Sequence, residues 1–355
     1  MEYPTDATGD DFTTDVALTA VDDALKATLR RYSHLLPPTL ITMGKIPLFV
    51  PGKVMHWRAA TERGDTAYIA SWPLTALRAY RASLPSSERH TWRRALPAAV
   101  ALEIMVAATD LIDDWTDGDP SPVISEYGAG QALNTASLML VMSQQVLVWA
   151  AQEGYDRALA ALGALQDLLV EAAVGQHLDM LYEDMGLDEV TPQMSGEMSE
   201  KKAGALISGA LMMGGVMAGA PSEALTLLAR LGKRAGGIAQ IANDIRDVLP
   251  HEVSTGNLPP VFSGPKTDIG RRKRTLPIVY TLREENETPN PLQVAFGAPR
   301  TQDEDEEALR RAIVEAGGIE FASMAIEMYD QDAKEALAAL DLLSPGAREE
   351  LSFLL

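Results

Sequence analysis

Two clusters of acidic side chains each end an apolar stretch of the sequence. The first is ATDLIDDWTDGD, residues 108–119, and the second lies in GGIAQIANDIRDVLP, residues 236–250. On a helix Asp113 and Asp117 are i, i+4 neighbours, and like charges at that spacing cost about 0.2–0.5 kcal/mol per pair. Burying unpaired carboxylates costs considerably more. A cation would offset this cost, and oxygen ligands of this kind suit Mg²⁺.

The second cluster repeats the pattern on another predicted helix. Gln240, Asp244 and Asp247 fall at i, i+4 and i+7, which places them on one face. If the two clusters face each other across a bundle, they form a site in which several metal ions hold a diphosphate. A helix end that simply reaches solvent would explain the first cluster taken alone, so the metal-site hypothesis depends on both clusters.

Basic residues accompany the acidic clusters. Lys202 lies near a predicted helix start, Arg246 lies inside the second cluster, and a basic run at residues 271–274 precedes a Thr-Leu-Pro sequence. A solvated basic loop is the alternative explanation for that run. Metal ions and cationic side chains together permit the metal-assisted departure of a diphosphate leaving group.

Charge and composition exclude several classes of protein. The 355 residues include 50 acidic and 30 basic side chains, for a net charge of −20, and such a surface repels nucleic acid and anionic lipid. There is no cysteine, so no thiolate metal site can form. The N-terminus lacks the features of a signal peptide. The longest apolar segment, residues 136–151, is shorter than the ~18–20 residues that span a bilayer. We therefore expect a soluble, cytoplasmic protein without a membrane span.

The hydrophobic pattern predicts an all-α protein. Long Ala-, Leu- and Met-rich segments are separated by Gly, Pro and Ser, and alternating β-branched runs are scarce. Segments 96–112 and 203–220 are apolar nearly all round, as in the centre of a bundle. We expect residues 1–15 to form an acidic flexible tail and residues 16–355 a single α-helical domain. The expected helices cover residues 15–33, 74–83, 87–115, 129–152, 155–185, 195–218, 222–249, 275–282, 304–316, 319–343 and 345–354.

Five motifs, in order along the chain, resemble those of the trans-isoprenyl diphosphate synthase (polyprenyl synthetase) family. This family shares its α-bundle with class I terpene synthases, and the resemblance extends from about Leu96 to Leu282. The motifs correspond to the first aspartate-rich DDxxD motif, the GQxxD segment, the lysine-bearing helix start, the second aspartate-rich motif and the late basic-Thr-Leu-Pro signature. Here they read DDWTD (113–117), GQHLD (175–179), EKKAG (200–204), QIANDIRD (240–247) and TDIGRRKRTLP (267–277).

The resemblance implies a single large helical bundle of the isoprenoid synthase type, with a central cavity that binds diphosphate and two or three Mg²⁺ ions. It also implies a homodimer. The implied metal ligands are Asp113, Asp117 and Asp244, supported by Asp114 and Asp247. The implied diphosphate-binding residues are Lys202, Arg246, Arg272 and Lys273. The implied substrate pocket contains Ala108, Thr109, Trp115, Gln176, Asp179 and Gln240. Because Ala108 and Thr109 are small, the resemblance implies room for a C15–C20 prenyl tail.

The acceptor half of the family's site is altered in this sequence. Chain-elongating members carry a GGKRxRP-like segment whose Lys and Arg hold isopentenyl diphosphate. The nearest segments here are MGKIP (43–47) and PGK (51–53), and neither is followed by the expected arginines; Arg58 is the closest. The Arg-Arg-Gly that follows DDxxD in the family is replaced by DGDPSPVISEYG (117–128), and Asn243 replaces the leading aspartate of the second motif. Each missing charge-assisted hydrogen bond would contribute ~1.5–3 kcal/mol.

Three functional hypotheses follow. The main one is a Mg²⁺-dependent class I terpene synthase, a diphosphate lyase that ionises farnesyl or geranylgeranyl diphosphate to a terpene product. The second is a trans-prenyltransferase, which elongates with isopentenyl diphosphate or prenylates an acceptor that carries no diphosphate. Its substitute acceptor contacts would come from Lys45, Lys53, Arg58 or Arg94, and two or more of these beside the first cluster would favour it. The third is a non-catalytic partner subunit.

Overall fold

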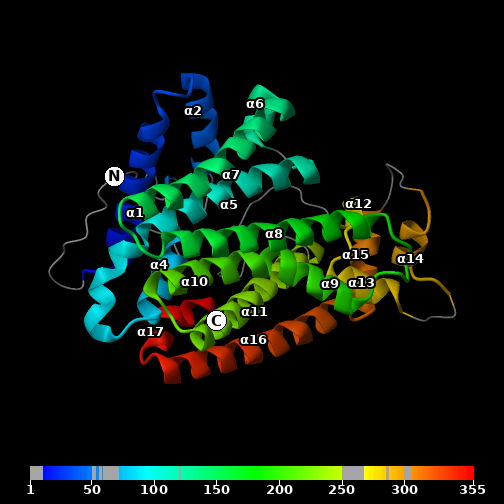
Figure 1. The fold of residues 1–355 in the computed structure, drawn as a ribbon. Helices are drawn as coiled ribbons and strands as arrows, with labels where there is room; N and C mark the ends of the chain where they lie inside the picture. The colour runs from blue at the N-terminus through cyan, green and yellow to red at the C-terminus, as the bar shows by residue number, and fades with distance from the viewer. Residues whose placement is uncertain are drawn as a thin grey trace. The chain divides into compact units, whose positions relative to one another are not determined.

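The computed structural model describes most of the chain, and the described part is built from helices without a strand, as predicted (Figure 1). The contacts of its Cα atoms divide the chain into two compact units. The first comprises residues 1–168, 207–230 and 336–354, and the second comprises residues 169–206 and 231–335 together with residue 355. The prediction of a single domain over residues 16–355 stays a prediction. The described residues are 11–49, 53–55, 58, 72–119, 121–249, 268–284, 288–299 and 305–355.

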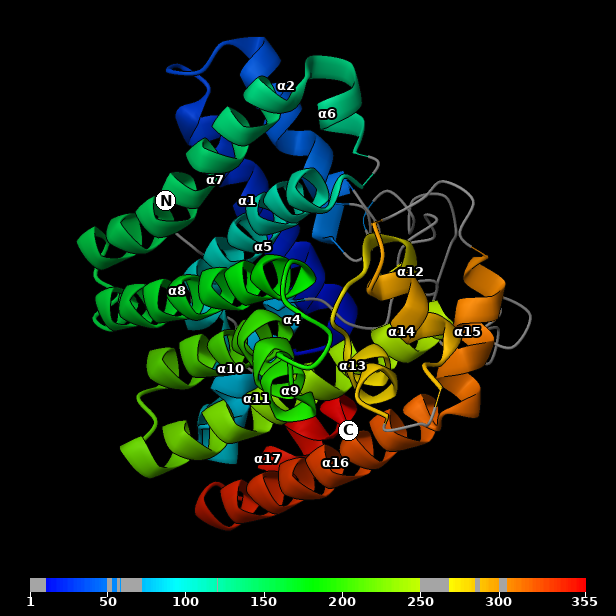
Figure 2. The same ribbon diagram turned by 90° about the vertical axis from the view of Figure 1, so that its right-hand side faces the viewer.

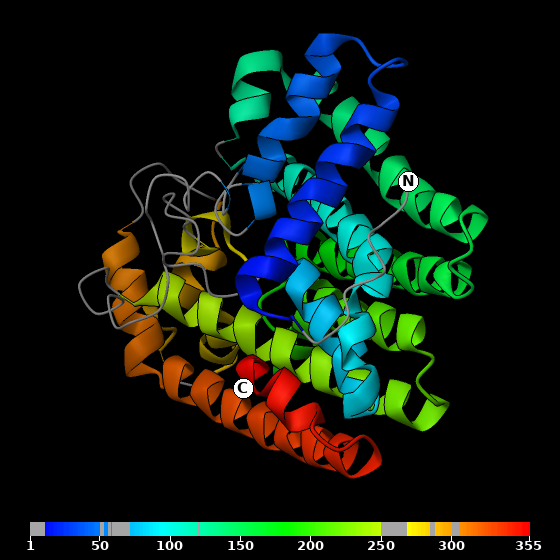
Figure 3. The same cartoon turned by 90° about the vertical axis from the view of Figure 1, so that its left-hand side faces the viewer.

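The first unit is centred on one buried helix, α5. Every residue of α5 from Leu96 to Ala108 is buried, which confirms the prediction of a central helix. Helices α1, α4 and α7 pack against α5, and the C-terminal α17, red in Figure 3, packs against α4. The other helices of this unit are short. The bounds are α1 (Thr14–Tyr32), α2 (Pro38–Lys45), η1 (Ile46–Phe49), α4 (Trp72–Ala82), η2 (Ser86–Ala95), α5 (Leu96–Asp117), α6 (Pro122–Tyr127), α7 (Ala129–Gln152), α17 (Ala347–Leu351) and η4 (Ser352–Leu354).

Four long helices have residues in both units. They are α8 (Ala158–Glu183), α10 (Ala205–Ala218), α11 (Ser222–Val248) and α16 (Gly318–Leu343). The second unit also contains a short π-helix, called the π-turn below, between α9 and α10. The short elements of the second unit are α9 (Pro192–Ser199), the π-turn (Glu200–Gly204), α12 (Asp268–Arg271), α13 (Leu276–Leu282), α14 (Pro291–Phe296) and α15 (Glu306–Glu315).

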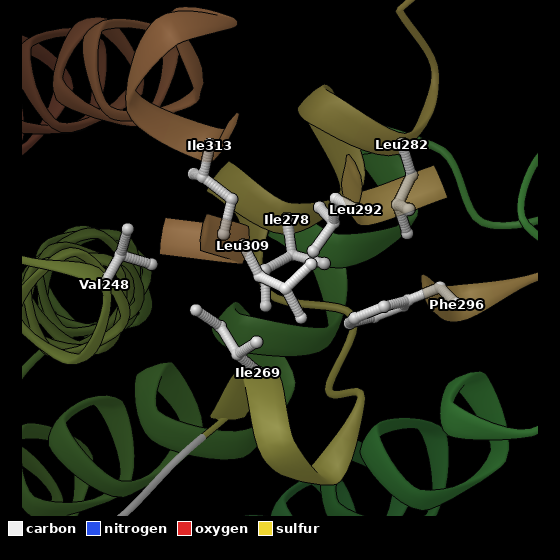
Figure 4. Packing of buried hydrophobic residues seen from close by; sticks show 8 residues of the cluster. All are labelled: Val248, Ile269, Ile278, Leu282, Leu292, Phe296, Leu309 and Ile313. Atoms are coloured by element: carbon white, nitrogen blue, oxygen red, sulfur yellow. The ribbon is translucent and has the colours of Figure 1, made fainter. Parts of the chain in front are cut away.

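The short helices of the second unit share an apolar core. Figure 2 shows α12, α13, α14 and α15 grouped together, in yellow and orange. Their buried side chains meet Val248 at the end of α11 (Figure 4). This core therefore supports the end of α11, where the second acidic cluster lies. The buried members are Val248, Ile269, Ile278, Leu282, Leu292, Phe296, Leu309 and Ile313.

The expected helix over residues 87–115 is wrong at its N-terminal end. Residues Ser86–Ala95 form a 3₁₀ helix, and α5 begins at Leu96 with Pro97 in its first turn. Proline has no backbone N–H and clashes with the carbonyl four residues earlier, so it belongs at a helix start. The expected helix over residues 195–218 is similarly divided into α9, the π-turn and α10.

Short helices also occupy two segments that our expected helices do not cover. Residues Pro38–Lys45 form α2. Residues Pro291–Phe296 form α14, where Asn290 and Gln293 make a capping box and Pro291 stands in the first turn. This Asn-Pro-x-Gln pattern was a helix-start signal that our sequence reading missed. Most of the segment at residues 250–271, which follows the expected helix 222–249, lies outside the described residues.

The expected N-terminal tail is anchored at its last residues. Asp11 forms an ion pair with Arg93 of η2 at 2.6 Å, and Phe12 packs edge-on against Trp92 with ring centroids 5.3 Å apart. The two guanidinium contacts of Arg93 hold the pKa of Asp11 at about 2. Helix α1 starts at Thr14. Residues 1–10 lie outside the described residues.

Candidate active site

The first acidic cluster lies in the last turns of α5. Asp113, Asp114 and Asp117 are half-buried there, and Gly118 ends the helix in the left-handed conformation with φ 65°. The last turn contains no basic residue. The C-terminal end of a helix carries partial negative charge, and three carboxylates at this position therefore repel the helix end as well as one another. The helix end is therefore suited to bind a cation.

A buried lysine pairs with Asp110, the first aspartate of this cluster. Lys53 Nζ is 2.8 Å from Asp110 Oδ2, and its side chain is 3% exposed. Of the four basic candidates for an acceptor contact, the structure places this one beside the first cluster. Arg58 instead donates to Thr19 Oγ1 at 3.4 Å, on α1.

The sequence reading missed Glu103, which lies two turns before Asp110 on α5. Its side chain is fully buried, and its Oε1 accepts a 2.6 Å hydrogen bond from the backbone N–H of Val54. Burial raises the pKa of Glu103 to about 7, although the nearby Lys53 ammonium lowers it. The segment at residues 53–54 is thus held to α5 by two carboxylates. A single Glu in an apolar helix was the only available sequence signal.

In the second unit, two lysines meet at one carboxylate oxygen. Lys202 Nζ and Lys273 Nζ lie 2.8 and 2.9 Å from Asp179 Oδ2, and Lys273 also lies 2.9 Å from Glu183 Oε1. Burial would raise the pKa of Asp179, but the two ammonium groups together hold it below its usual value. This arrangement keeps two positive charges close together in a largely buried place, as a diphosphate site requires.

The π-turn places Lys202 at this point. A Cβ atom on Gly175 of α8 would lie 2.3 Å from the backbone nitrogen of Lys202, and one on Gly236 of α11 would lie 2.5 Å from Cα of Gly204. The two glycines therefore let α8 and α11 approach the π-turn closely on either side. Short π-helical insertions occur frequently at functional sites.

Asp244 is the most deeply buried member of the second cluster, at 1% exposed. Its Oδ1 accepts from Gln240 Nε2 at 2.8 Å, whereas its Oδ2 is buried and has no hydrogen-bond partner within the described part of the chain. Burial, together with the charges of Asp268 and Asp179, raises the pKa of Asp244 well above its ordinary value. A buried carboxylate oxygen without a donor fits a divalent cation, which would satisfy it.

The other predicted side chains of this region make different contacts. Asp247 Oδ2 accepts from the backbone N–H of Asp268 at 2.8 Å. Arg246 donates to the carbonyl of Ala242 at 3.3 Å. Arg272 has φ 62°, in the left-handed region, and its Nη1 donates to the carbonyl of Ala298 at 2.6 Å. Of the four predicted diphosphate-binding residues, the structure brings Lys202 and Lys273 together.

The predicted pocket residues differ in exposure. Ala108 is buried in α5, the Thr109 hydroxyl donates to the carbonyl of Val106 at 3.0 Å, and Trp115 is 46% exposed. Gln176 is half-buried on α8, next to Gly175. Ile104, one turn before Ala108, lines a narrow apolar pocket together with Leu29, Leu36, Leu40, Ile41, Gly44, Leu48, Leu138, Met139 and Met142. Within the described residues, no three acidic or histidine side chains converge on one metal position.

Comparisons with known proteins identify the relatives of this chain. The family model described as polyprenyl synthetase matches residues 72–315. Geranylfarnesyl diphosphate synthase of Aeropyrum pernix is 27% identical over 274 residues, which are 74% of this chain and 81% of that protein. Geranylgeranyl diphosphate synthase of Mycobacterium tuberculosis is 27% identical over 310 residues, 81% of this chain and 85% of that protein. The crystal structure of a polyprenyl synthetase from Streptomyces coelicolor has a TM-score of 0.74, with 24% identity over 96% of each chain.

Proposed function

Because this chain belongs to the polyprenyl synthetase family, we propose that it is a Mg²⁺-dependent trans-prenyltransferase that ionises an allylic isoprenoid diphosphate. The observation that carries the proposal is the pair of ammonium groups of Lys202 and Lys273 on one buried carboxylate, Asp179. The curated relatives are prenyl diphosphate synthases, which supports transfer of the prenyl group over its release as a terpene.

Different residues of the chain have different roles in the ionisation of the substrate. When the allylic C–O bond breaks, its electron pair stays on the diphosphate, and the acceptor's double bond then supplies the pair that forms the new C–C bond. The cation left on the acceptor loses a proton, and the electrons of that C–H bond form the new double bond. Lys202 and Lys273 donate hydrogen bonds to the departing oxygens, and Asp179 keeps both ammonium groups charged and oriented. Asp113, Asp117 and Asp244 would hold Mg²⁺, with Asp114 and Asp247 as supporting ligands. Bound Mg²⁺ supplies positive charge that stabilises the leaving group.

The prenyl substrate is proposed to be C15 to C20, farnesyl or geranylgeranyl diphosphate. Ala108 and Thr109 are small side chains near the metal-binding end of α5. The apolar pocket at Ile104 lies one turn earlier on the same helix. The names of the two relatives given above indicate C25 and C20 products, which agrees with a long apolar substrate.

A terpene synthase remains a second candidate because of one observation. Lys53, the basic group beside the first cluster, is buried and already forms an ion pair with the half-buried Asp110. The two arginines that would follow DDxxD are absent from the sequence. An acceptor diphosphate would have to compete with Asp110 for Lys53. With a weak acceptor site, the allylic cation would cyclise or lose a proton instead.

We also propose that the chain forms a homodimer in the cytoplasm. By length and composition alone, helix α8 is apolar enough to cross a membrane, and only 28% of its most apolar stretch of 18 residues is buried. Val170, Val174 and Leu181 on α8 are 67%, 43% and 45% exposed. A second copy would cover this surface, and size-exclusion chromatography with light scattering would show twice the mass of one 38.2 kDa chain.

The test incubates the purified protein with Mg²⁺ and farnesyl or geranylgeranyl diphosphate, with and without isopentenyl diphosphate, and identifies the products by mass. A longer diphosphate that needs isopentenyl diphosphate is the expected result. A hydrocarbon or terpene alcohol from the allylic substrate alone would replace the proposal by the second candidate. No product under either condition, with diphosphate binding intact, would favour a partner subunit.

A further inference from the structure

Arg234 lies on α11, outside the motifs described above, and joins three elements of the second unit. Its Nε lies 2.5 Å from Asp332 Oδ2 on α16. Its Nη1 binds Glu200 Oε1, the first residue of the π-turn. Its Cζ stands 4.7 Å from the ring centroid of Tyr329 on α16. One guanidinium thus ties α11 and α16 to the start of the π-turn.

Tyr329 holds the same carboxylate from a second direction. Its hydroxyl is hydrogen-bonded with Glu200, and burial together with that contact raises the pKa of Tyr329. The ring lies against Gly237, where an added Cβ would be 2.8 Å from Tyr329 Cε2. At Gly196 an added Cβ would be 3.2 Å from the hydroxyl. Small residues therefore make room for the ring, and Glu200 has two partners.

Glu200 stands two residues before Lys202 within the π-turn. Gly175 and Gly236 limit how far the π-turn can move toward α8 or α11, but they do not fix its rotation about its own axis. Helical residues follow one another at about 100° around the axis, so relaxation by one residue would turn Lys202 away from Asp179. A π-turn has one residue more than an α-turn and persists where its surroundings hold it. The contacts of Glu200 provide that restraint.

We propose that Arg234 and Tyr329 are positioning residues that orient Lys202 toward the leaving diphosphate through Glu200. The inference rests on the proposed function, because it assigns the diphosphate to Lys202. A merely structural role for the same ion pairs would stabilise the fold without affecting diphosphate binding. The side chains of Arg234, Glu200 and Asp332 are 31%, 23% and 24% exposed, so substitutions there leave no large cavity.

The primary variant is Arg234→Gln, with Arg234→Lys as the conservative variant. The matched control is Lys233→Gln, which breaks the neighbouring 2.7 Å ion pair between α11 and Glu171 on α8. Binding of inorganic diphosphate in the presence of Mg²⁺ is measured by calorimetry on the full chain, alongside the melting temperature and kcat. We expect Arg234→Gln to weaken diphosphate binding about tenfold, the size of one charge-assisted hydrogen bond. Arg234→Lys should recover part of this loss, and Lys233→Gln should stay within about twofold of wild type.

A double-mutant cycle separates positioning from simple stability. If Arg234 acts through Lys202, Arg234→Gln causes no further loss of diphosphate binding when Lys202 is already Gln. Diphosphate binding by Arg234→Gln equal to that of wild type would overturn the inference, and so would a full additional loss in the Lys202→Gln background. If Lys202→Gln itself binds diphosphate normally, the site assignment of the proposed function fails first. If only Lys202→Gln is impaired, the proposed function stands and the role of Arg234 is rejected.

Discussion

Two acidic sites, one in each unit, balance their charge in different ways. In the first unit, the carboxylates of Asp113 and Asp117 are half-buried at the negative end of α5, in a turn without basic residues. In the second unit, Asp179 is almost completely buried and carries two ammonium groups of the same chain. The carboxylates of the first cluster are therefore suited to an added cation, whereas the charge of Asp179 is balanced by two lysines of the chain itself. In the proposed function the first site is the metal-binding end, and the site at Asp179 is the diphosphate-binding end.

The strongest test of this comparison replaces one proposed metal ligand of the first cluster. We expect Asp113→Ala or Asp117→Ala to lower Mg²⁺-dependent kcat by at least about a thousandfold, because roughly 4 kcal/mol of transition-state stabilisation is lost. The fold should persist, since removal of one of several like charges relieves repulsion. Circular dichroism and steady-state turnover measure the two effects. Asp156→Asn, an exposed surface change, is the control, and near-normal activity of either alanine variant would contradict the metal-site assignment.

The second test removes Asp179, the carboxylate that the two lysines of the diphosphate-binding end share, and leaves Glu183 beside Lys273. Asp179→Asn should destabilise the protein by about 3–5 kcal/mol, because the ammonium groups of two buried or partly buried lysines lose their shared partner. Urea unfolding measures this effect. The same change at the exposed Asp156 should cost less than about 0.5 kcal/mol. Equal unfolding free energies for the two variants would show that Asp179 is not the charge-balancing group.

A pH series sharpens the comparison within the first unit. The pKa of Glu103 is about 7 in the folded chain and 4.5 as an ordinary value, so between these pH values the folded chain binds a proton that the unfolded chain has released. Stability should then fall as pH rises from 4.5 to 7, by up to roughly 3 kcal/mol. Glu103→Gln should remove this part of the slope. The unfolding free energies of the wild type and of Glu103→Gln are measured at pH 5, 6, 7 and 8. Parallel curves would show that the pKa of Glu103 is not raised in the folded chain.

The smallest expected effect concerns the position of the π-turn. Gly175→Ala should displace the backbone of Lys202, because the new Cβ would lie 2.3 Å from its nitrogen. Gly163→Ala on the same helix meets nothing within 4 Å and should stabilise the chain by up to about 1 kcal/mol. Calorimetry should show several-fold weaker diphosphate binding for the first variant and unchanged binding for the second. Equal affinities would mean that the π-turn accommodates the methyl group.

Much of the fold could be predicted because the long helices, α5 and α7 among them, coincide with long Ala-, Leu- and Met-rich segments that Gly, Pro and Ser separate. The motifs also indicated Lys202, Lys273 and Asp244 before their geometry was known. The pairing of Lys53 with Asp110 could not be predicted, since nothing local links residues 57 positions apart. Arg234 and Tyr329 were missed for the same reason: their importance comes from tertiary contacts to Glu200, which no spacing along the chain reveals.

The left-handed backbone at Arg272 determines which of the neighbouring cationic side chains reaches Asp179. Residues 271–274 are four consecutive positive charges, and composition alone makes them interchangeable. The reversal of backbone handedness at Arg272 sends its guanidinium to Ala298 and the next side chain, the Lys273 ammonium, to Asp179. Handedness at one residue thus selects a compact ammonium over a planar guanidinium at this point. Deletion of Arg271 or Arg272 would move Lys273 into the position of Arg272 and Arg274 into the position of Lys273. Asp179 would then face a guanidinium in place of an ammonium, so the charge would stay positive while the hydrogen-bond geometry changed.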